Sequence, residues 1–398
     1  MAVERLFPTE EGHDLVALVR EIAQAELAPR ASAAEAAGEF PRDLFTLLGE
    51  SGLLGMPYPE KWGGLAQPYE VYLQAVEELS TAWLSVGVGV SVHVMTCLAV
   101  ATHGTAAQQE ALLPDMIGGQ LLGAYALSEA GAGSDIAAMT TKARADGDHW
   151  VVNGTKSWIS HSGHADYYTT FVRTDNDRSL PVSCFIVPAD LAGLSFGTPE
   201  HKMGMNASPT ATVHFDDVQV PTDRLIGDPG HGLRIALGSL DSGRLGIAAC
   251  ATGLAQAALD LAVDHARERH QFGRAIAEFQ GMQFLLADMA TAVDRARATY
   301  LHAARLKDAG RTYSRAAAVA KLTATDAAMQ VTEDAVQVLG GYGYTRDFPA
   351  ERWMREAKVT QIFEGTNQIQ RIVIARQLIG SQVRSGLATR NTDRRQEN

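Results

Sequence analysis

Apolar residues change their spacing twice along this 398-residue chain, and these changes divide it into three zones. From Asp14 to about Leu122 they recur every three to four positions, which is typical of helices with one buried face. Pro29 interrupts the first of these helices. The segment 83–100 is apolar on almost all sides, which predicts a helix that is buried all round.

The middle zone, 123–238, has the signals of a β domain. Segments rich in β-branched and aromatic residues are separated by glycine, proline and aspartate, and they lie at 150–152, 167–172, 182–187 and 212–215. Because no amphipathic helix stands between these segments, we expect an antiparallel sheet.

Helical spacing returns at Arg244 and continues through four long stretches, of which the last is Gln368 to Leu378. Long helices with short connections predict a four-helix bundle. The predicted fold is of the α+β class. It has an N-terminal all-α domain at 1–122, a middle antiparallel β domain at 123–238, a C-terminal four-helix bundle at 239–385 and a flexible tail at 386–398.

Charge and composition exclude several classes of function. The chain has 34 Lys and Arg against 46 Asp and Glu, a net charge of −12, which disfavours nucleic acid as a main partner. No apolar run reaches the roughly 20 residues that cross a bilayer, so we expect no membrane partner. The N-terminus has no signal-peptide pattern, and the Cys97, Cys184 and Cys250 spacing matches no disulfide framework. We therefore expect a reducing compartment, a bacterial cytoplasm.

Common cofactor and metal motifs are missing or incomplete. The Gly131-Ala132-Gly133 run resembles the start of a dinucleotide loop, but Ile136 stands where its third glycine is required. His161 and His164 are three residues apart, and no third ligand can be placed beside them. We expect solvent-exposed loop histidines there and no metal site.

Three segments have unusual local chemistry: 126–135, 337–343 and 361–370. The first two are glycine-rich loops that would let a ligand approach the backbone, or else an ordinary helix-to-strand turn and an ordinary helix C-cap. In the third, Glu364 stands among Ile362, Phe363 and Gly365. Desolvation would raise its pKa and suit it to act as a general base. It could equally be a helix N-terminal acid with Thr366 or Asn367 as the cap.

These segments, in this order, resemble the acyl-CoA dehydrogenase family of flavoproteins. The resemblance runs from about Glu11 to Ile379, with one family signature at 126–138 and a second at 337–356. The short-chain, butyryl-type branch is the most similar, through 240–246, 350–352 and 362–366. The family fold has the same three zones that the residue pattern predicts.

The resemblance implies FAD as cofactor. The residues that it implies along the flavin are Tyr125, Leu127, Ser128, Gly133, Ser134, Trp158, Ile159 and Ser160, and Thr366 and Gln368 match contacts to the adenylate half. In the family, the tryptophan covers one flavin face and the residue matching Ser160 approaches flavin N5. Residues that would reach the FAD of a neighbouring subunit are Arg269, Phe272, Gln280, Gln337, Gly340 and Gly341. A shared cofactor implies a homo-oligomer, in this family commonly a tetramer built as a dimer of dimers.

The resemblance also implies a reaction. Glu364 matches the base that removes the α-proton of an acyl-CoA thioester while the β-hydrogen leaves as hydride to flavin N5, giving the trans-2-enoyl-CoA. An electron-transfer flavoprotein would then accept the electrons. Some family branches carry the base at the position of Gly243 and a glycine at the position of Glu364, so this chain has the commoner arrangement.

Residues that the resemblance places against acyl-CoA are Ser134, Asp241, Arg244, Phe363 and Gly365. Asp241 and Arg244 could instead form a structural ion pair, and the two roles are compatible. Tyrosine is usual at the position of Phe363. The segment 83–92 has no basic residue, which disfavours a dicarboxylyl substrate. Gly87 and Gly89 could admit a longer or branched acyl tail or serve only helix packing. The sequence therefore does not specify the length or branching of the acyl chain.

Two other interpretations are compatible with the same fold. One is an acyl-CoA oxidase or another acyl-CoA-processing flavoenzyme, and the other is a helical scaffold without activity. A length of 398 residues and the presence of Glu364 favour the dehydrogenase.

Overall fold

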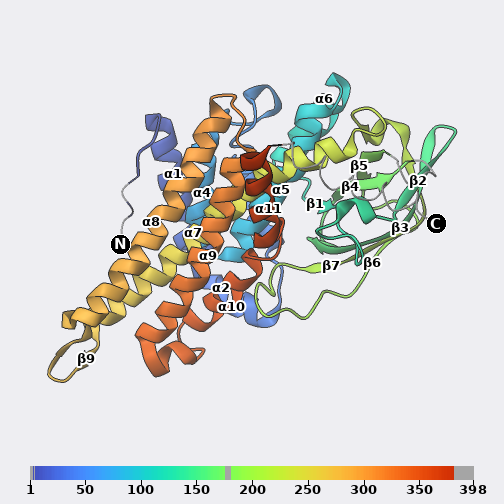
Figure 1. Cartoon of the computed structure of the whole chain (residues 1–398). Coiled ribbons are helices and arrows are strands. Elements are labelled where there is room, and N and C mark those ends of the chain that lie inside the picture. The colour runs from blue at the N-terminus through green and yellow to red at the C-terminus, as the bar shows by residue number, and fades with distance from the viewer. Residues whose placement is uncertain (1–2, 4, 175–180, 381–398) are drawn as a thin grey trace, which may run out of the picture.

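The computed structural model describes residues 3, 5–174 and 181–380. Figure 1 shows two regions: helices from both ends of the chain pack together, and a β-sheet lies at one side of them. This is the predicted α+β architecture with a helical, a β and a second helical zone. The predicted tail at 386–398 lies outside the described residues, and the domain boundaries stay a prediction.

Six α-helices make up the N-terminal zone: α1 (Glu10–Ile22), α2 (Ala28–Ala37), α3 (Arg42–Glu50), α4 (Tyr69–Ala82), α5 (Leu84–His103) and α6 (Ala106–Ile117). The interruption predicted at Pro29 takes a different form. A π-helical turn, Ala23–Leu27, joins α1 to α2, and Pro29 lies in the first turn of α2, where a missing N–H costs nothing. Thr105 caps α6 through a capping box with Gln108.

The helix α5 is buried on nearly all sides, as the sequence predicts. By length and composition, α5 and α7 (Gly232–Glu268) are each long and apolar enough to cross a membrane, so the expectation that no run reaches that length was wrong. Their most apolar windows are 89% and 83% buried inside the protein, as in core helices.

The middle zone forms one eight-stranded sheet. Its strands are β1 (Gly123–Ala126), β2 (Lys142–Asp146), β3 (His149–Ser160), β4 (Tyr167–Arg173), β5 (Val182–Pro188), β6 (Leu194–Phe196), β7 (Thr210–Pro221) and β8 (Leu225–Ile226). Their order is β6-β7-β3-β2-β4-β5-β8, with β1 beside β4. Pairing is antiparallel except that β4 lies parallel to β1 and, at one residue pair, to β2.

The C-terminal zone contains α7, α8 (Gln280–Asp308), α9 (Ser314–Leu339), α10 (Ala350–Thr360) and α11 (Asn367–Ile379). A small hairpin, β9 (His270–Gln271) and β10 (Arg274–Ala275), joins α7 to α8. The sequence analysis missed α10, a short helix with one apolar face. Since α7 begins at Gly232, its first turns precede residue 239, where the bundle was predicted to start. The helix α7 packs against α4 and α5 as well as α8 and α9, which unites both helical zones around one core.

The sheet has a smaller core of its own, formed by the inward-facing residues of β3, β4, β5 and β7. All three cysteines are free and buried: Cys97 lies in α5, Cys184 in β5 and Cys250 in α7. Burial raises the pKa of the Cys97 thiol to about 11, so it stays protonated and behaves as a small apolar group.

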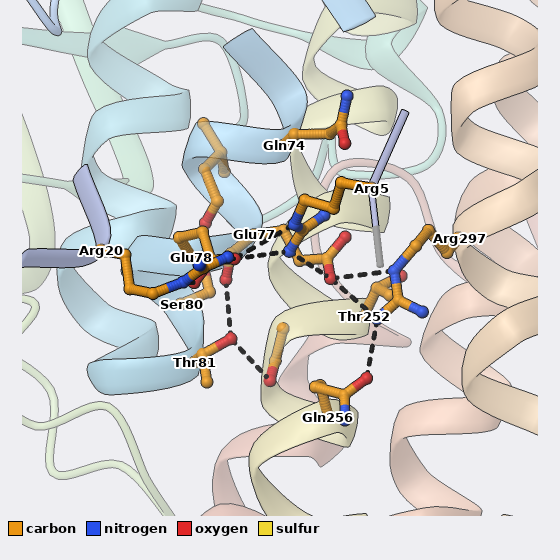
Figure 2. A network of polar contacts seen from close by, with 12 residues as sticks. Arg5, Arg20, Gln74, Glu77, Glu78, Ser80, Thr81, Thr252, Gln256 and Arg297 are labelled. Atoms are coloured by element: carbon orange, nitrogen blue, oxygen red, sulfur yellow. Dashed lines mark hydrogen bonds and ion pairs between the residues drawn. The ribbon is translucent and has the colours of Figure 1, made fainter. Parts of the chain in front are cut away.

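A buried ionic network ties the start of the chain to the helices (Figure 2). Arg5 donates to Glu77 and Glu78 of α4, and Arg297 of α8 donates to the same Glu77 carboxylate. Arg20 of α1 completes the network by donating to Glu78. Segments up to 220 residues apart in sequence are thereby held together by charge-assisted hydrogen bonds.

Candidate active site

The loop between α10 and α11 carries Glu364. Thr366 caps α11 by accepting from the Ile369 amide at 3.2 Å, so the capping role that the sequence left open belongs to Thr366. Glu364 and Gly365 both have left-handed backbones, with φ of +54° and +85°. A glutamate in this region is uncommon and strained, and such strain is concentrated at functional sites.

The Glu364 carboxylate lies against α7. A Cβ at Gly243 would lie 2.8 Å from Glu364 Oε2 and 2.7 Å from Met95 Sδ, so only glycine leaves room for both side chains. The position at which some branches of the resembled family carry the base therefore borders the same space as Glu364. Glycine at 243 and glutamate at 364 are compatible partners, and a bulky residue at 243 would displace the carboxylate.

The protonation of Glu364 is set by this enclosed position. The residue as a whole is partly exposed, but its Oε2 is buried and has no hydrogen-bond partner among the described residues. Burial raises the pKa of Glu364 to about 7, while the positive charges of Arg244 and Lys321 work in the opposite direction. A carboxylate without a donor, with a pKa near neutrality, is suited to accept a proton from a ligand.

Asp241 and Arg244 form an ion pair on α7, with Arg244 Nη1 2.5 Å from Asp241 Oδ1. The structural role that the sequence analysis weighed for this pair is thus present. Arg244 Nε is buried and has no partner among the described residues, and Ser314 donates to Asp241 at 3.1 Å. Arg244 is therefore anchored through Nη1, while its buried Nε has no partner among the described residues.

The glycine-containing loop after β1 is held rigidly from below by Glu129. Its carboxylate accepts from the Thr140 and Thr141 amides, at 2.6 and 2.9 Å, and from Lys156 Nζ of β3 at 2.9 Å. Burial opposes ionisation of Glu129, but the Lys156 charge and these donors lower its pKa to about 2. The sequence analysis assigned no role to Glu129 or Lys156. A lysine at an inward-facing position of a strand was the signal that could have revealed the pair.

Residues predicted beside FAD line the open side of this loop. Ser128 is bound to β3, since its hydroxyl donates to the Ser157 carbonyl at 2.7 Å, and Leu127 is buried beneath. Gly133 and Ser134 are exposed, and a Cβ at Gly133 would meet no atom within 4 Å. Tyr125 donates to the Ala236 carbonyl at 3.3 Å, which links β1 to α7.

Trp158 projects from the sheet at an irregular point of β3. The β3–β7 register shifts between Lys156 and Ile159, and Trp158 has φ of +65°. This bulge leaves the Trp158 side chain 63% exposed, while Ile159 is buried and Ser160 is partly buried. An exposed indole on a bulge is a surface suited to stacking against an aromatic ligand.

The second predicted FAD group lies elsewhere on the chain. Arg269 directly precedes the β9–β10 hairpin, and Phe272, 93% exposed, lies in its turn. Figure 1 places this hairpin at the end of the helices distant from the sheet. The Arg269 guanidinium lies 5.8 Å from the ring centroid of Tyr342, which follows Gly341. Exposed residues complete this group: Gln280, Gln337, Gly340 and Gly341. One chain does not bring these residues to the loop after β1.

The remaining predicted residues are distributed around the Glu364 loop. Phe363 is partly buried, and Gln368 is exposed on the first turn of α11. The Gly365 carbonyl accepts from Lys321 Nζ at 3.0 Å and from Gln370 Nε2 at 2.8 Å. Lys321, Gln370 and Met95 were missed because single residues within helical patterns carry no sequence signal of what they contact.

The expectation of two solvent-exposed histidines was half wrong. His164 is exposed, but His161 is fully buried between Phe40 and Phe45 and contacts the Gly123 carbonyl at 3.0 Å. Burial lowers the pKa of His161 to about 4, so it is neutral. In the described ranges, no three His, Cys, Asp or Glu side chains gather as a metal site would require.

The chain is similar in sequence to proteins of known families. The chain matches three family profiles in sequence: the acyl-CoA dehydrogenase N-terminal domain over residues 9–120, the middle domain over 124–218 and the C-terminal domain over 230–379. The mitochondrial short-chain specific acyl-CoA dehydrogenase of Rattus norvegicus is 43% identical over 364 residues, covering 91% of this chain and 88% of that protein. An acyl-CoA dehydrogenase of Bacillus subtilis is 42% identical, covering 94% of this chain and 99% of the other.

Solved structures agree with the sequence matches. Butyryl-CoA dehydrogenase from Megasphaera elsdenii superposes with a TM-score of 0.92 at 36% identity, covering 95% of this chain and 100% of that one. A chain from a structural study of the electron transferring flavoprotein of Acidaminococcus fermentans gives 0.91 at 42% identity, covering 94% and 100%.

Proposed function

This chain belongs to the acyl-CoA dehydrogenase family of FAD-dependent oxidoreductases, and we propose that it converts a short acyl-CoA thioester to its trans-2-enoyl-CoA. The observation that carries the proposal is the Glu364 carboxylate, which lies beside Gly243 and has a pKa near neutrality, and whose Oε2 has no hydrogen-bond donor among the described residues.

Glu364 performs the proton transfer. Its Oε2 takes the α-proton of the thioester, and the electron pair of that C–H bond forms the new double bond as the β-hydrogen departs with its own pair. FAD supplies the acceptor for this hydride when it is bound. Two electrons and two hydrogens thus leave the substrate, one hydrogen as a proton on Glu364 and one as hydride.

The loop that holds Glu364 also serves the developing enolate. In the described part of the chain, no hydrogen-bond acceptor faces the Glu364 backbone amide. The left-handed turn at Glu364 and Gly365 leaves this amide free to donate to the thioester oxygen. Base and oxyanion donor would then come from one residue, which fixes their relative positions.

The residues present fit FAD. The open space at Gly133, the exposed indole of Trp158 and the rigid Glu129–Lys156 support beneath the loop form a cradle with an aromatic wall. The exposed group around Phe272 and Gly341 would hold the cofactor of a neighbouring subunit. We therefore propose a homo-oligomer, a dimer of dimers, because one chain cannot bring both groups to one cofactor.

The proposed substrate and electron acceptor are inferred from proteins similar to this chain. The names of the rat and Megasphaera proteins specify short-chain and butyryl-CoA substrates, and the Acidaminococcus study concerns an electron transferring flavoprotein. We extend both to this chain: a short, monocarboxylic acyl-CoA in fatty-acid β-oxidation, with an electron-transfer flavoprotein as acceptor. A cytoplasmic location stays a prediction.

An anaerobic titration of the purified protein with butyryl-CoA tests the proposal. We expect the visible flavin band to bleach as acyl-CoA is added, with one enoyl-CoA formed for each flavin reduced. A yellow protein that no acyl-CoA bleaches would refute the reaction. Fast reoxidation of the reduced protein by O₂ would favour the oxidase, and a protein that fails to bind added FAD would favour the scaffold.

A further inference from the structure

We propose that Lys321 of α9 is the positioning residue of the Glu364 loop: its ammonium holds the backbone at Gly365 and the start of α11. This inference rests on the proposed function, because it assigns the support of that function's catalytic residue. Lys321 does not touch the reacting atoms, and it acts only through Glu364 and Gly365.

Lys321 is buried and is held by two hydrogen bonds. The residue is 0% exposed, and its Nζ donates to the Gly365 carbonyl at 3.0 Å and to Asn367 Oδ1 at 2.9 Å. Asn367 is the first residue of α11, and its side-chain Nδ2 donates to Asp326 Oδ1 at 2.7 Å. A single ammonium therefore fixes both the loop residue after the base and the start of the next helix.

The loop needs such support because its conformation is strained. Two consecutive residues, Glu364 and Gly365, have positive φ, and for glutamate that conformation costs free energy. Gln370 is the other side chain that donates to the Gly365 carbonyl, at 2.8 Å, and it comes from the same helix that the loop precedes. Lys321 comes from a different helix, α9, so it alone of the two ties the loop to the bundle.

Two cationic side chains act on the base. Arg244 of α7 and Lys321 of α9 both favour ionised Glu364, and the neutral Tyr125 of β1 also interacts with it electrostatically. Arg244 already has a counterion in Asp241 at 2.5 Å. Around Lys321, the facing charged groups are Glu364, Asp326 and Arg244. Burial lowers the pKa of Lys321 to about 7, and the two carboxylates oppose that shift.

Loss of Lys321 should change both the pKa of Glu364 and the rate of flavin bleaching. An opposite charge close to a carboxyl lowers its pKa by about 1–3 units, so loss of the Lys321 charge would raise the pKa of Glu364 by about one unit or more. Displacement of a catalytic group by about 1 Å costs about 10²-fold in rate. Loss of both the charge and the hydrogen bonds should therefore change the pH profile as well as the maximal rate.

The test compares the FAD-loaded variants Lys321→Met, Lys321→Gln and Lys321→Arg with Lys202→Met. Lys202 is the control, since it likewise donates to a backbone carbonyl, that of Ser208 at 3.0 Å, but is only partly buried. The measurements are FAD content, thermal midpoint and the pH dependence of flavin bleaching by butyryl-CoA.

In Lys321→Met, we expect the flavin to bleach about 10²-fold more slowly than in wild type. The acid limb of its pH–rate profile should lie about one pH unit or more higher. Lys321→Gln keeps a hydrogen-bond donor but not the charge. Its acid limb should therefore move as far as that of Lys321→Met, while its bleaching rate falls less. Lys321→Arg keeps the charge and should leave the limb near that of wild type, and Lys202→Met should change neither property. Unmoved acid limbs in both Lys321→Met and Lys321→Gln would overturn the proposal.

A second readout separates this proposal from the proposed function. The pKa of Glu364 can be followed without turnover by carbon NMR of protein labelled at glutamate Cδ, with Glu364→Gln identifying the resonance. A wild-type protein that acyl-CoA does not bleach would refute the proposed function alone. The NMR titration would still test Lys321, because its removal must raise the pKa of Glu364 if the inference is correct.

Discussion

Two glutamates of this protein, each with a buried carboxylate oxygen, differ in their environment. Glu77 of α4 is fully buried and accepts from Arg5 and Arg297 (Figure 2). It also accepts from the Tyr300 hydroxyl. Burial alone would raise its pKa, but these cations outweigh burial and lower it, so Glu77 stays ionised. The carboxylate has no capacity left for a ligand, and its role is structural.

Glu364 is partly exposed as a residue, but its Oε2 is buried and has no partner among the described residues. The charges of Arg244 and Lys321 do not outweigh burial, which raises the pKa of Glu364 to about 7. The contrast shows that burial does not by itself make a carboxylate reactive or structural. The number of hydrogen bonds it receives decides which form is stable and whether a proton can be accepted.

The largest expected effect is that of Glu364→Gln, which keeps the shape of the side chain and removes its basicity. Since a positioned base supplies about 10²–10⁴-fold of rate, flavin bleaching should slow by that factor, while FAD binding and the thermal midpoint are retained. Stopped-flow absorbance measures the rate, with Glu333→Gln on the exposed face of α9 as control. Turnover at the wild-type rate would remove Glu364 from its assigned role.

Glu77→Gln should lower stability and leave the bleaching rate unchanged, the opposite of Glu364→Gln. Arg5 and Arg297 would remain buried without that carboxylate, and breaking a buried ion pair from one side costs about 3–5 kcal/mol. We expect a lower midpoint in urea unfolding, with an unchanged bleaching rate per bound FAD in the folded protein. Unchanged stability would mean that the network contributes no net free energy and that the comparison fails.

The pH dependence of bleaching sharpens the comparison. Glu364 must be ionised to accept a proton, and a carboxyl with a raised pKa is protonated below about 7. The rate should therefore fall about tenfold for each pH unit below that value and level off above it. Glu77→Gln should leave this profile in place, whereas a profile that is flat through neutral pH would contradict the assignment of the base.

Arg5→Met tests the network with a smaller effect. Glu77 would keep Arg297 and Tyr300, and Glu78 would keep Arg20, so only part of the hydrogen bonding is lost. We expect a destabilisation of about 1–3 kcal/mol and easier proteolysis before α1. The control is Arg30→Met, which breaks a more exposed pair with Asp43 and should cost at most about 1 kcal/mol. Equal effects of the two variants would show that burial adds nothing to this contact.

Much of the fold could be predicted because secondary structure follows local patterns. The periods that predicted helix, sheet and helix also predicted the fully buried α5 and the long helices of the bundle. The π-turn before Pro29 and the short helix α10 were missed, since each depends on how its segment packs. His161 was assigned to solvent because its neighbours are turn residues, while Phe40 and Phe45, which bury it, lie over a hundred positions earlier.

The sequence by itself determined the three zones, the family and which residue to propose as the base, because these reside in residue order and in motifs that are continuous along the chain. Only the tertiary structure decided which charges meet. It placed Gly243 beside Glu364, Lys321 beneath Gly365 and Arg5 against Glu77, across separations of up to 121 residues. The pKa of a buried carboxylate depends on the donors and charges within a few ångströms, and folding brings these together from distant parts of the chain.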